Sequence, residues 1–68
     1  MELQLRINGA ERRFSRPLTV REVVGELGFE GKRVAIERNG EIVPRSRYAE
    51  VALADGDRLE VVVAVGGG

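Results

Sequence analysis

The fold is decided by the segment Thr19-Val20-Arg21-Glu22-Val23-Val24-Gly25-Glu26-Leu27-Gly28, which carries the clearest helix signals in the chain. Thr19 can cap a helix, and Glu22 three residues later completes a capping box. Gly28 suits the left-handed position that ends a helix. Gly25 lies off the apolar face and makes a helix about 1 kcal/mol less stable than alanine would. One apolar stripe at helical spacing is formed by Val20, Val23, Val24 and Leu27. We therefore predict one short helix with a single apolar face.

Two strands joined by a tight turn are predicted before the helix. The run from Glu2 to Ile7 alternates, so that its apolar residues share one face, as in a half-buried strand. Asn8-Gly9 is typical of a two-residue hairpin, because both turn positions need positive φ. The second strand is expected from about Glu11 to Phe14.

A second hairpin is predicted after the helix. Val34 to Arg38 forms its first strand, and Asn39-Gly40 turns the chain into Glu41-Ile42-Val43. Pro44 ends this short strand because proline cannot donate to a central ladder. The stretch from Arg45 to Ala54 is expected to be irregular, with one helical turn near Ser46 to Ala49.

The longest apolar strand is predicted near the end of the sequence. Asp55-Gly56-Asp57 is a third turn signal, and Arg58 to Val65 follows as a strand. Its inward face is expected to hold Leu59, Val61, Val63 and Val65, and its outward face Glu60, Val62 and Ala64.

These elements follow the order strand, strand, helix, strand, short strand, long strand. One helix over one face of a mixed sheet of four to five strands is the economical way to bury both apolar faces. If the first and last strands are neighbours, they are parallel. The predicted fold is therefore α+β, the β-grasp of ubiquitin-like proteins, with a domain over residues 1–65 and a flexible glycine tail over residues 66–68.

Composition excludes several classes of function. The sequence has no cysteine and no histidine, which argues against ordinary zinc sites, thiolate nucleophiles and a bound cofactor held by them. Basic and acidic residues number 11 each, so the balance is not that of a nucleic-acid or acidic-membrane binder. The first residues lack the apolar block of a signal peptide, which predicts a cytoplasmic protein.

Catalysis by this chain itself is also disfavoured. No histidine is present to activate the candidate nucleophiles, which are Ser15, Thr19, Lys32, Ser46 and Tyr48. Asp55 and Asp57 are close enough to form a carboxylate pair, but a turn explains them more simply. We therefore expect a protein that is not an enzyme.

The sequence ends in Val65-Gly66-Gly67-Gly68. A glycine carboxylate is unhindered, and an extended tail from Val65 to Gly68 reaches about 13 Å, enough to enter the active site of a partner. The tail then makes the protein a substrate of another enzyme, which converts its carboxylate into an acyl-adenylate and then a thiocarboxylate. The alternative interpretation is an inert, frayed end.

Over essentially its full length the chain resembles the sulfur carrier proteins of thiamine biosynthesis. The resemblance is strongest in Val34 to Ser46, in Asp55 to Val62 and in the glycine tail. It implies that a ubiquitin-activating-type adenylyltransferase uses ATP to adenylate Gly68, with Gly66 and Gly67 as the threading tail. It also implies a sulfur donor fed from cysteine, such as a desulfurase, and delivery of the sulfur to thiazole synthase. Related carriers for molybdopterin and tRNA thiolation share the fold, and an interaction module with an inert tail is a further alternative.

A docking face is predicted on the last strand. Val62 and Ala64 are apolar on the outward face, and Ala35 lies beside them if the third strand neighbours the last. Such a patch leading into the tail suits the activating enzyme. Scattered surface apolar residues are the alternative, since they are common on any protein.

Overall fold

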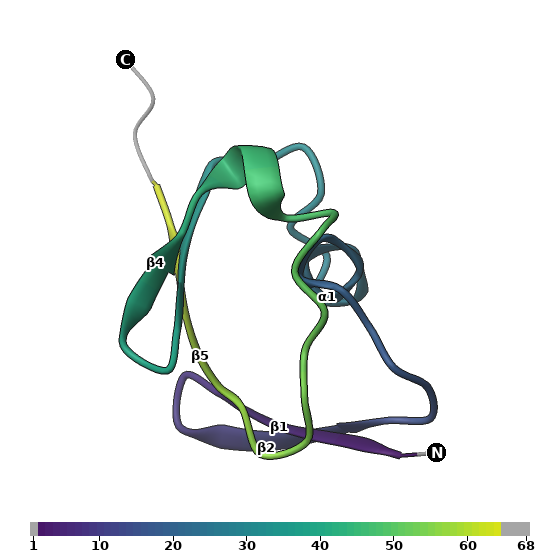
Figure 1. The fold of residues 1–68 in the computed structure, drawn as a ribbon. Coiled ribbons are helices and arrows are strands. Elements are labelled where there is room, and N and C mark those ends of the chain that lie inside the picture. The colour runs from purple at the N-terminus through teal and green to yellow at the C-terminus, as the bar shows by residue number, and fades with distance from the viewer. Residues whose placement is uncertain (1, 65–68) are drawn as a thin grey trace.

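The computed structural model describes residues 2–64, and these fold into one curved sheet with a helix against its inner face (Figure 1). The elements are β1 (Leu3–Ile7), β2 (Ala10–Phe14), α1 (Val20–Glu26), β3 (Val34–Arg38), β4 (Glu41–Val43), a 3₁₀ turn (Arg45–Arg47) and β5 (Arg58–Val63). All the predicted strands and the predicted helix are present, in the predicted order.

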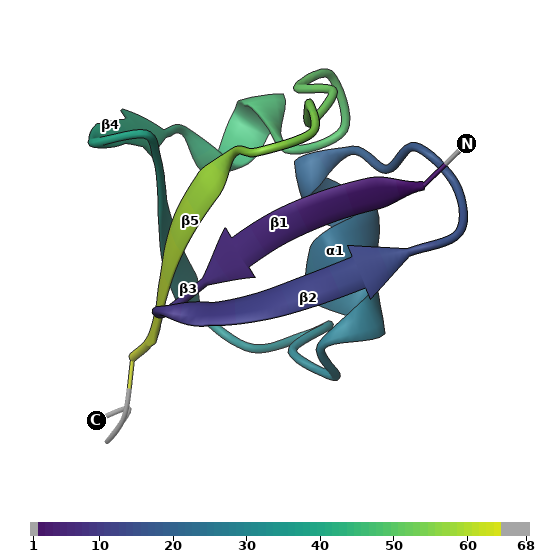
Figure 2. The ribbon, with the colours of Figure 1, turned by 90° about the horizontal axis from the view of Figure 1, so that it is seen from below.

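The sheet has the strand order β2-β1-β5-β3-β4. β1 and β5 are parallel neighbours in the centre, as predicted, and the other pairs are antiparallel. Figure 2 shows β1 and β5 side by side, with α1 behind the sheet. Since α1 belongs to the connection between the β1–β2 and β3–β4 hairpins, it packs across the sheet that these hairpins build with β5.

Both ends of α1 are closed by the residues that the sequence indicated. The Glu22 backbone N–H donates to Thr19 Oγ1 at 3.2 Å, and the Thr19 N–H donates to Glu22 Oε1 at 2.9 Å. This second bond lowers the pKa of Glu22. At the other end Gly28 has a φ of 80°. Its N–H donates to the Gly25 carbonyl, and the next N–H, of Phe29, donates to the Val24 carbonyl, which is the Schellman pattern.

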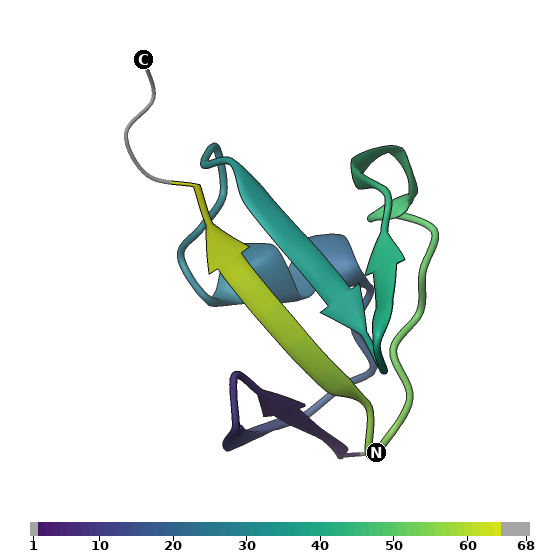
Figure 3. The same cartoon turned by 90° about the vertical axis from the view of Figure 1, so that its left-hand side faces the viewer.

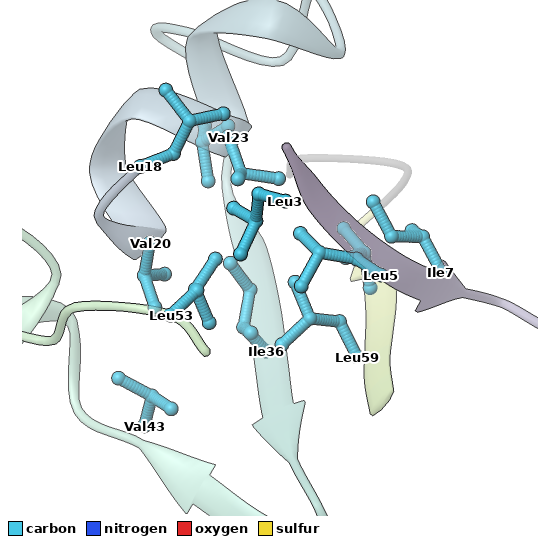
Figure 4. Close-up of a cluster of buried hydrophobic side chains, with 12 residues drawn as sticks. Leu3, Leu5, Ile7, Leu18, Val20, Val23, Ile36, Val43, Leu53 and Leu59 are labelled. Carbon is cyan, nitrogen blue, oxygen red and sulfur yellow. The ribbon is translucent and has the colours of Figure 1, made fainter. Parts of the chain in front are cut away.

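The core forms where the apolar faces of the helix and the sheet meet (Figure 4). Its buried members are Leu3, Leu5, Ile7, Leu18, Val20, Val23, Val24, Ile36, Val43, Leu53, Leu59 and Val61. Two of them, Leu18 and Leu53, come from segments without regular structure. The Leu53 N–H donates to the Leu18 carbonyl at 2.9 Å, which joins the approach to α1 to the segment before β5.

The predicted starts of β1 and β2 each differ from the structure by one residue, and two other boundaries differ by more. β5 ends at Val63, so Ala64 is not part of the strand that was predicted to continue to Val65, and Val65 lies outside the described residues. The helical turn is a 3₁₀ turn over Arg45–Arg47 rather than Ser46 to Ala49. It starts directly after Pro44, whose ring fixes φ near −61° and prepares the chain to turn there.

Two glycines of the helix region are expected to respond oppositely to the same substitution. A Cβ at Gly25 would lie 3.4 Å from Glu30 Oε2, an ordinary contact, so Gly25→Ala should stabilise the protein by about 0.5–1 kcal/mol. Gly28→Ala should destabilise it by about 1 kcal/mol, because its φ of 80° is left-handed. Thermal or urea unfolding measures both. Equal shifts of the same sign would contradict this account of the helix end.

Candidate functional site

The site is organised around β5, which leads into the predicted glycine tail. β5 lies between β1 and β3 and is therefore held from both sides. Beyond the strand, the Ala64 N–H donates to the Arg33 carbonyl at 2.9 Å. Gly66, Gly67 and Gly68 lie outside the described residues, and so does the proposed boundary between domain and tail. Their roles stay predictions.

Two of the predicted docking residues, Ala35 and Val62, lie side by side on the face of the sheet away from α1. Val62 is 61% exposed and is the register partner of Ala35, which is also exposed. Ala64 is exposed just beyond the end of β5. Figure 3 looks onto this face, with β5, β3 and β4 in front and α1 behind. The structure thus brings Ala35 and Val62 to one surface, with Ala64 exposed just beyond the end of β5.

Sequence reasoning missed a further apolar residue of this face. Ile42 in β4 is 68% exposed, more than any other large apolar side chain among residues 2–64. Its neighbour Val43 is buried in the core. The alternation of Glu41-Ile42-Val43 was the available signal, because burying Val43 obliges Ile42 to point outward.

The asparagines of the two hairpin turns have a second role that their turn signals did not reveal. Both adopt a left-handed φ of 51°. The Val61 N–H donates to Asn8 Oδ1 at 2.7 Å, and Asn8 Nδ2 donates to the Val61 carbonyl at 3.0 Å. The Arg58 N–H donates to Asn39 Oδ1 at 2.9 Å. The two turns therefore fix the backbone of β5 from opposite sides.

Asp57 is a buried carboxylate with a structural rather than a catalytic environment. It is 7% exposed and accepts from Arg38 Nε at 2.8 Å, Asn39 Nδ2 at 3.0 Å and the Ala54 N–H at 2.8 Å. Burial raises its pKa, but these hydrogen bonds and the Arg38 charge outweigh burial, so the pKa is lowered. Asp55 instead accepts from the Gln4 N–H at 2.7 Å. Asp55 and Asp57 thus accept hydrogen bonds from different donors and do not act as a carboxylate pair, which agrees with the interpretation of this segment as a turn.

A hollow of about 790 Å³ lies between α1 and the segment around Tyr48. It is lined by basic side chains, including Arg21, Lys32 and Arg45, together with acidic ones, so it has no single charge character. Tyr48 donates its hydroxyl to the Val34 carbonyl at 3.2 Å, and burial raises the pKa of Tyr48. That hydroxyl therefore stabilises the fold as a neutral donor.

Two further observations concern the described part of the chain. Residues 2–64 contain no cluster of three or more histidine, cysteine or acidic side chains arranged to hold a metal ion. No helix among them has the length and apolar character that crossing a membrane requires.

Sequence comparison agrees with the geometry. The model of the ThiS family matches residues 5–68. The sulfur carrier protein ThiS of Bacillus subtilis is 38% identical over 65 residues, covering 94% of this chain and 98% of that protein. A thiazole synthase of Paramagnetospirillum magneticum is 56% identical over 66 residues, covering 97% of this chain. The chain spans only 20% of the length of that relative.

Structural comparison gives the same answer. The crystal structure of a thiamine biosynthesis protein (ThiS) from Geobacter metallireducens matches with a TM-score of 0.82 and 29% sequence identity. The match covers 97% of this chain and 100% of that one. It confirms the predicted β-grasp fold, with its mixed sheet on one helix. From the family match over residues 5–68 and this likeness of fold, we conclude that the chain belongs to the ThiS family.

Proposed function

We propose that the protein is a sulfur carrier for the thiazole ring of thiamine, and that Gly68 is its acyl site. The observation that carries the proposal is membership of the ThiS family together with the Gly66-Gly67-Gly68 sequence, which follows β5 after two residues. The relatives support the pathway, since one is a sulfur carrier protein and another is a thiazole synthase. The protein is then a co-substrate of other enzymes rather than an enzyme.

The chemistry needs nothing from this chain except an accessible carboxylate. In the first step a Gly68 carboxylate oxygen attacks the α-phosphorus of ATP in a partner's active site, and pyrophosphate leaves. In the second step hydrosulfide, released by a thiol reductant from the persulfide of the sulfur donor, attacks the carbonyl carbon of the acyl-adenylate, and AMP leaves. The product is a thiocarboxylate. Glycines without side chains permit the tail to thread into the partner's site.

Three partners follow from this chemistry. A ubiquitin-activating-type adenylyltransferase supplies the ATP site. A desulfurase or a similar donor supplies sulfur taken from cysteine. Thiazole synthase accepts the sulfur.

The test is conversion of the protein in vitro. The 68-residue protein is incubated with ATP, sulfide and the adenylyltransferase encoded in the same genome, and its intact mass is measured. The expected result is exchange of one oxygen for sulfur, followed by consumption of the product by thiazole synthase. Consumption instead by a molybdopterin or tRNA-thiolation enzyme would reassign the pathway. An unchanged mass would contradict the carrier function and favour the alternative, an interaction module with an inert tail.

The docking role of Val62, Ala64 and Ala35 belongs to this proposal. We expect Val62→Asp to weaken binding to the adenylyltransferase at least tenfold, because a charge replaces an apolar contact beside the tail. The fold should persist, since Val62 is 61% exposed. Ala10→Asp adds the same charge to the exposed start of β2 and should leave binding unchanged. Titration calorimetry measures both, and an unaltered Kd for folded Val62→Asp would remove Val62 from the interface.

A further inference from the structure

Two carboxylates face each other at the centre of the outer sheet surface. Glu37 in β3 and Glu60 in β5 are register partners, and both are exposed. Directly opposed residues of an antiparallel pair have Cα atoms about 4.5–5.5 Å apart, and like charges there are destabilising. None of the ion pairs among residues 2–64 involves either carboxylate.

The surroundings of this pair are apolar on two sides. Ile42 on β4 is the register partner of Glu37, so the two side chains lie on the same face of the sheet. Val62 lies two residues after Glu60 on β5 and therefore also points to that face. Ile42 is 68% and Val62 61% exposed. Both carboxylates also line an open hollow of about 570 Å³, with Asn39, Gly40 and Arg58 as its other walls. The face therefore combines a hollow that has two carboxylates and one guanidinium in its walls with two exposed apolar side chains beside it.

The neighbouring part of the outer surface, on β1 and β2, carries charges of both signs, since the exposed Glu11 is the register partner of Arg6. Arg6 in β1 and Arg58 in β5 are register partners and are both exposed. Arg58 lines the hollow, yet no ion pair joins it to Glu37 or Glu60 in the described part of the chain. Among the outward carboxylates of the strands, Glu11 pairs with Arg13, whereas Glu37 and Glu60, in the half that carries Ile42 and Val62, have no ion pair in the described part of the chain.

We propose that the outer patch, consisting of Ala35, Glu37, Ile42, Glu60 and Val62, docks a surface that inserts one arginine or lysine between apolar side chains. This inference rests on the proposed function, because it assigns that surface to the activating enzyme. A guanidinium or ammonium group between the two carboxylates removes their mutual repulsion and forms charge-assisted hydrogen bonds with both. The apolar side chains of Ile42 and Val62 exclude water from the ion pairs in the complex, as the contacts that surround an interface hot spot do. The repulsion present in the free protein is then relieved only in the complex.

The test measures binding and stability separately, because removing the two charges should lower the affinity for the adenylyltransferase and raise the thermal midpoint of the free protein. In the Glu37→Gln/Glu60→Gln double variant, binding to the adenylyltransferase should weaken about 10- to 100-fold, and its dependence on salt should flatten. The thermal midpoint of the free variant should rise, since the like charges are gone. Ile42→Ser should weaken binding about tenfold with an unchanged midpoint. Glu11→Gln removes an exposed carboxylate from β2, which β1 separates from β5 in the sheet, and is the matched control, with wild-type binding expected.

The outcomes distinguish this inference from the proposed function. If the wild-type protein acquires sulfur at Gly68 while the double variant binds and reacts like it, the outer patch is not the docking face and the carrier function stands. A double variant that binds the adenylyltransferase normally but fails only with thiazole synthase overturns the choice of partner. If the wild-type protein neither binds the adenylyltransferase nor changes mass, both proposals are wrong.

Discussion

Removal of Gly68 is expected to abolish thiocarboxylate formation completely. The truncated protein still ends in glycine, but its carboxylate lies one residue, about 3.3–3.6 Å, short of where a partner's ATP site would meet it. Appending one alanine after Gly68 should have the same effect, because the carboxylate is then displaced and carries a side chain. The measurement is the intact mass after incubation with ATP, sulfide and the adenylyltransferase.

The control for this prediction is the stability of the variants. The buried core residues among residues 2–64 lie between Leu3 and Val61, and neither change alters any of them, so both variants should unfold at the wild-type temperature. A substitution of Gly66 by alanine should reduce the rate of conversion without preventing it. Fragmentation of the wild-type product should locate sulfur at the carbonyl of Gly68, and sulfur at any other position would refute the mechanism.

Of the substitutions considered, removal of the Asp57 carboxylate should lower the free energy of unfolding most. Asp57→Ala leaves Arg38, Asn39 and the Ala54 N–H without their shared acceptor. Removing one member of a buried ion pair typically destabilises by about 3–5 kcal/mol. Because the Arg38 side chain is 32% exposed and can turn to water, we expect about 2–3 kcal/mol here. For a domain of this size the melting temperature should fall by about 10–20 °C.

The neighbouring carboxylate is the matched control. Asp55 belongs to the same turn but is exposed and accepts one hydrogen bond, from the Gln4 N–H. Asp55→Ala should therefore lower stability by only about 0.5–1.5 kcal/mol. Equal losses for the two variants would show that burial of Asp57 has no special consequence.

The stabilisation by Asp57 should also depend on pH in a defined direction. Its pKa in the folded protein is lowered, so its contribution is fully present above the ordinary aspartate pKa of about 3.9 and disappears as the pH falls through the folded value. The stability difference between wild type and Asp57→Asn should be constant near neutral pH and shrink below about pH 4. Urea unfolding at a series of pH values measures this difference, and a constant difference down to pH 2 would contradict it.

The helix, the turns and the strands of this protein can be predicted from short stretches of its sequence. The capping box of Thr19 and Glu22, the two Asn-Gly turns and the alternating faces of β1 and β5 are all read over a few neighbouring residues. Such patterns follow from backbone geometry and from the periods of helix and strand, so they need no knowledge of distant contacts. The predicted outward position of Val62 followed in the same way, because its neighbour Val61 had to be buried.

The contacts between elements that are distant in sequence depend on the tertiary structure. Asn8 was predictable as a turn residue, but its bonds to Val61, 53 positions away, depend on β1 and β5 being neighbours. The burial of Asp57 against Arg38, 19 positions away, depends equally on the register of β3 with β5. The same register places Glu37 opposite Glu60, which no local pattern indicates. The physical reason is that register is fixed by the packing of the whole sheet on α1, and a shift of one residue would exchange every inward side chain for an outward one.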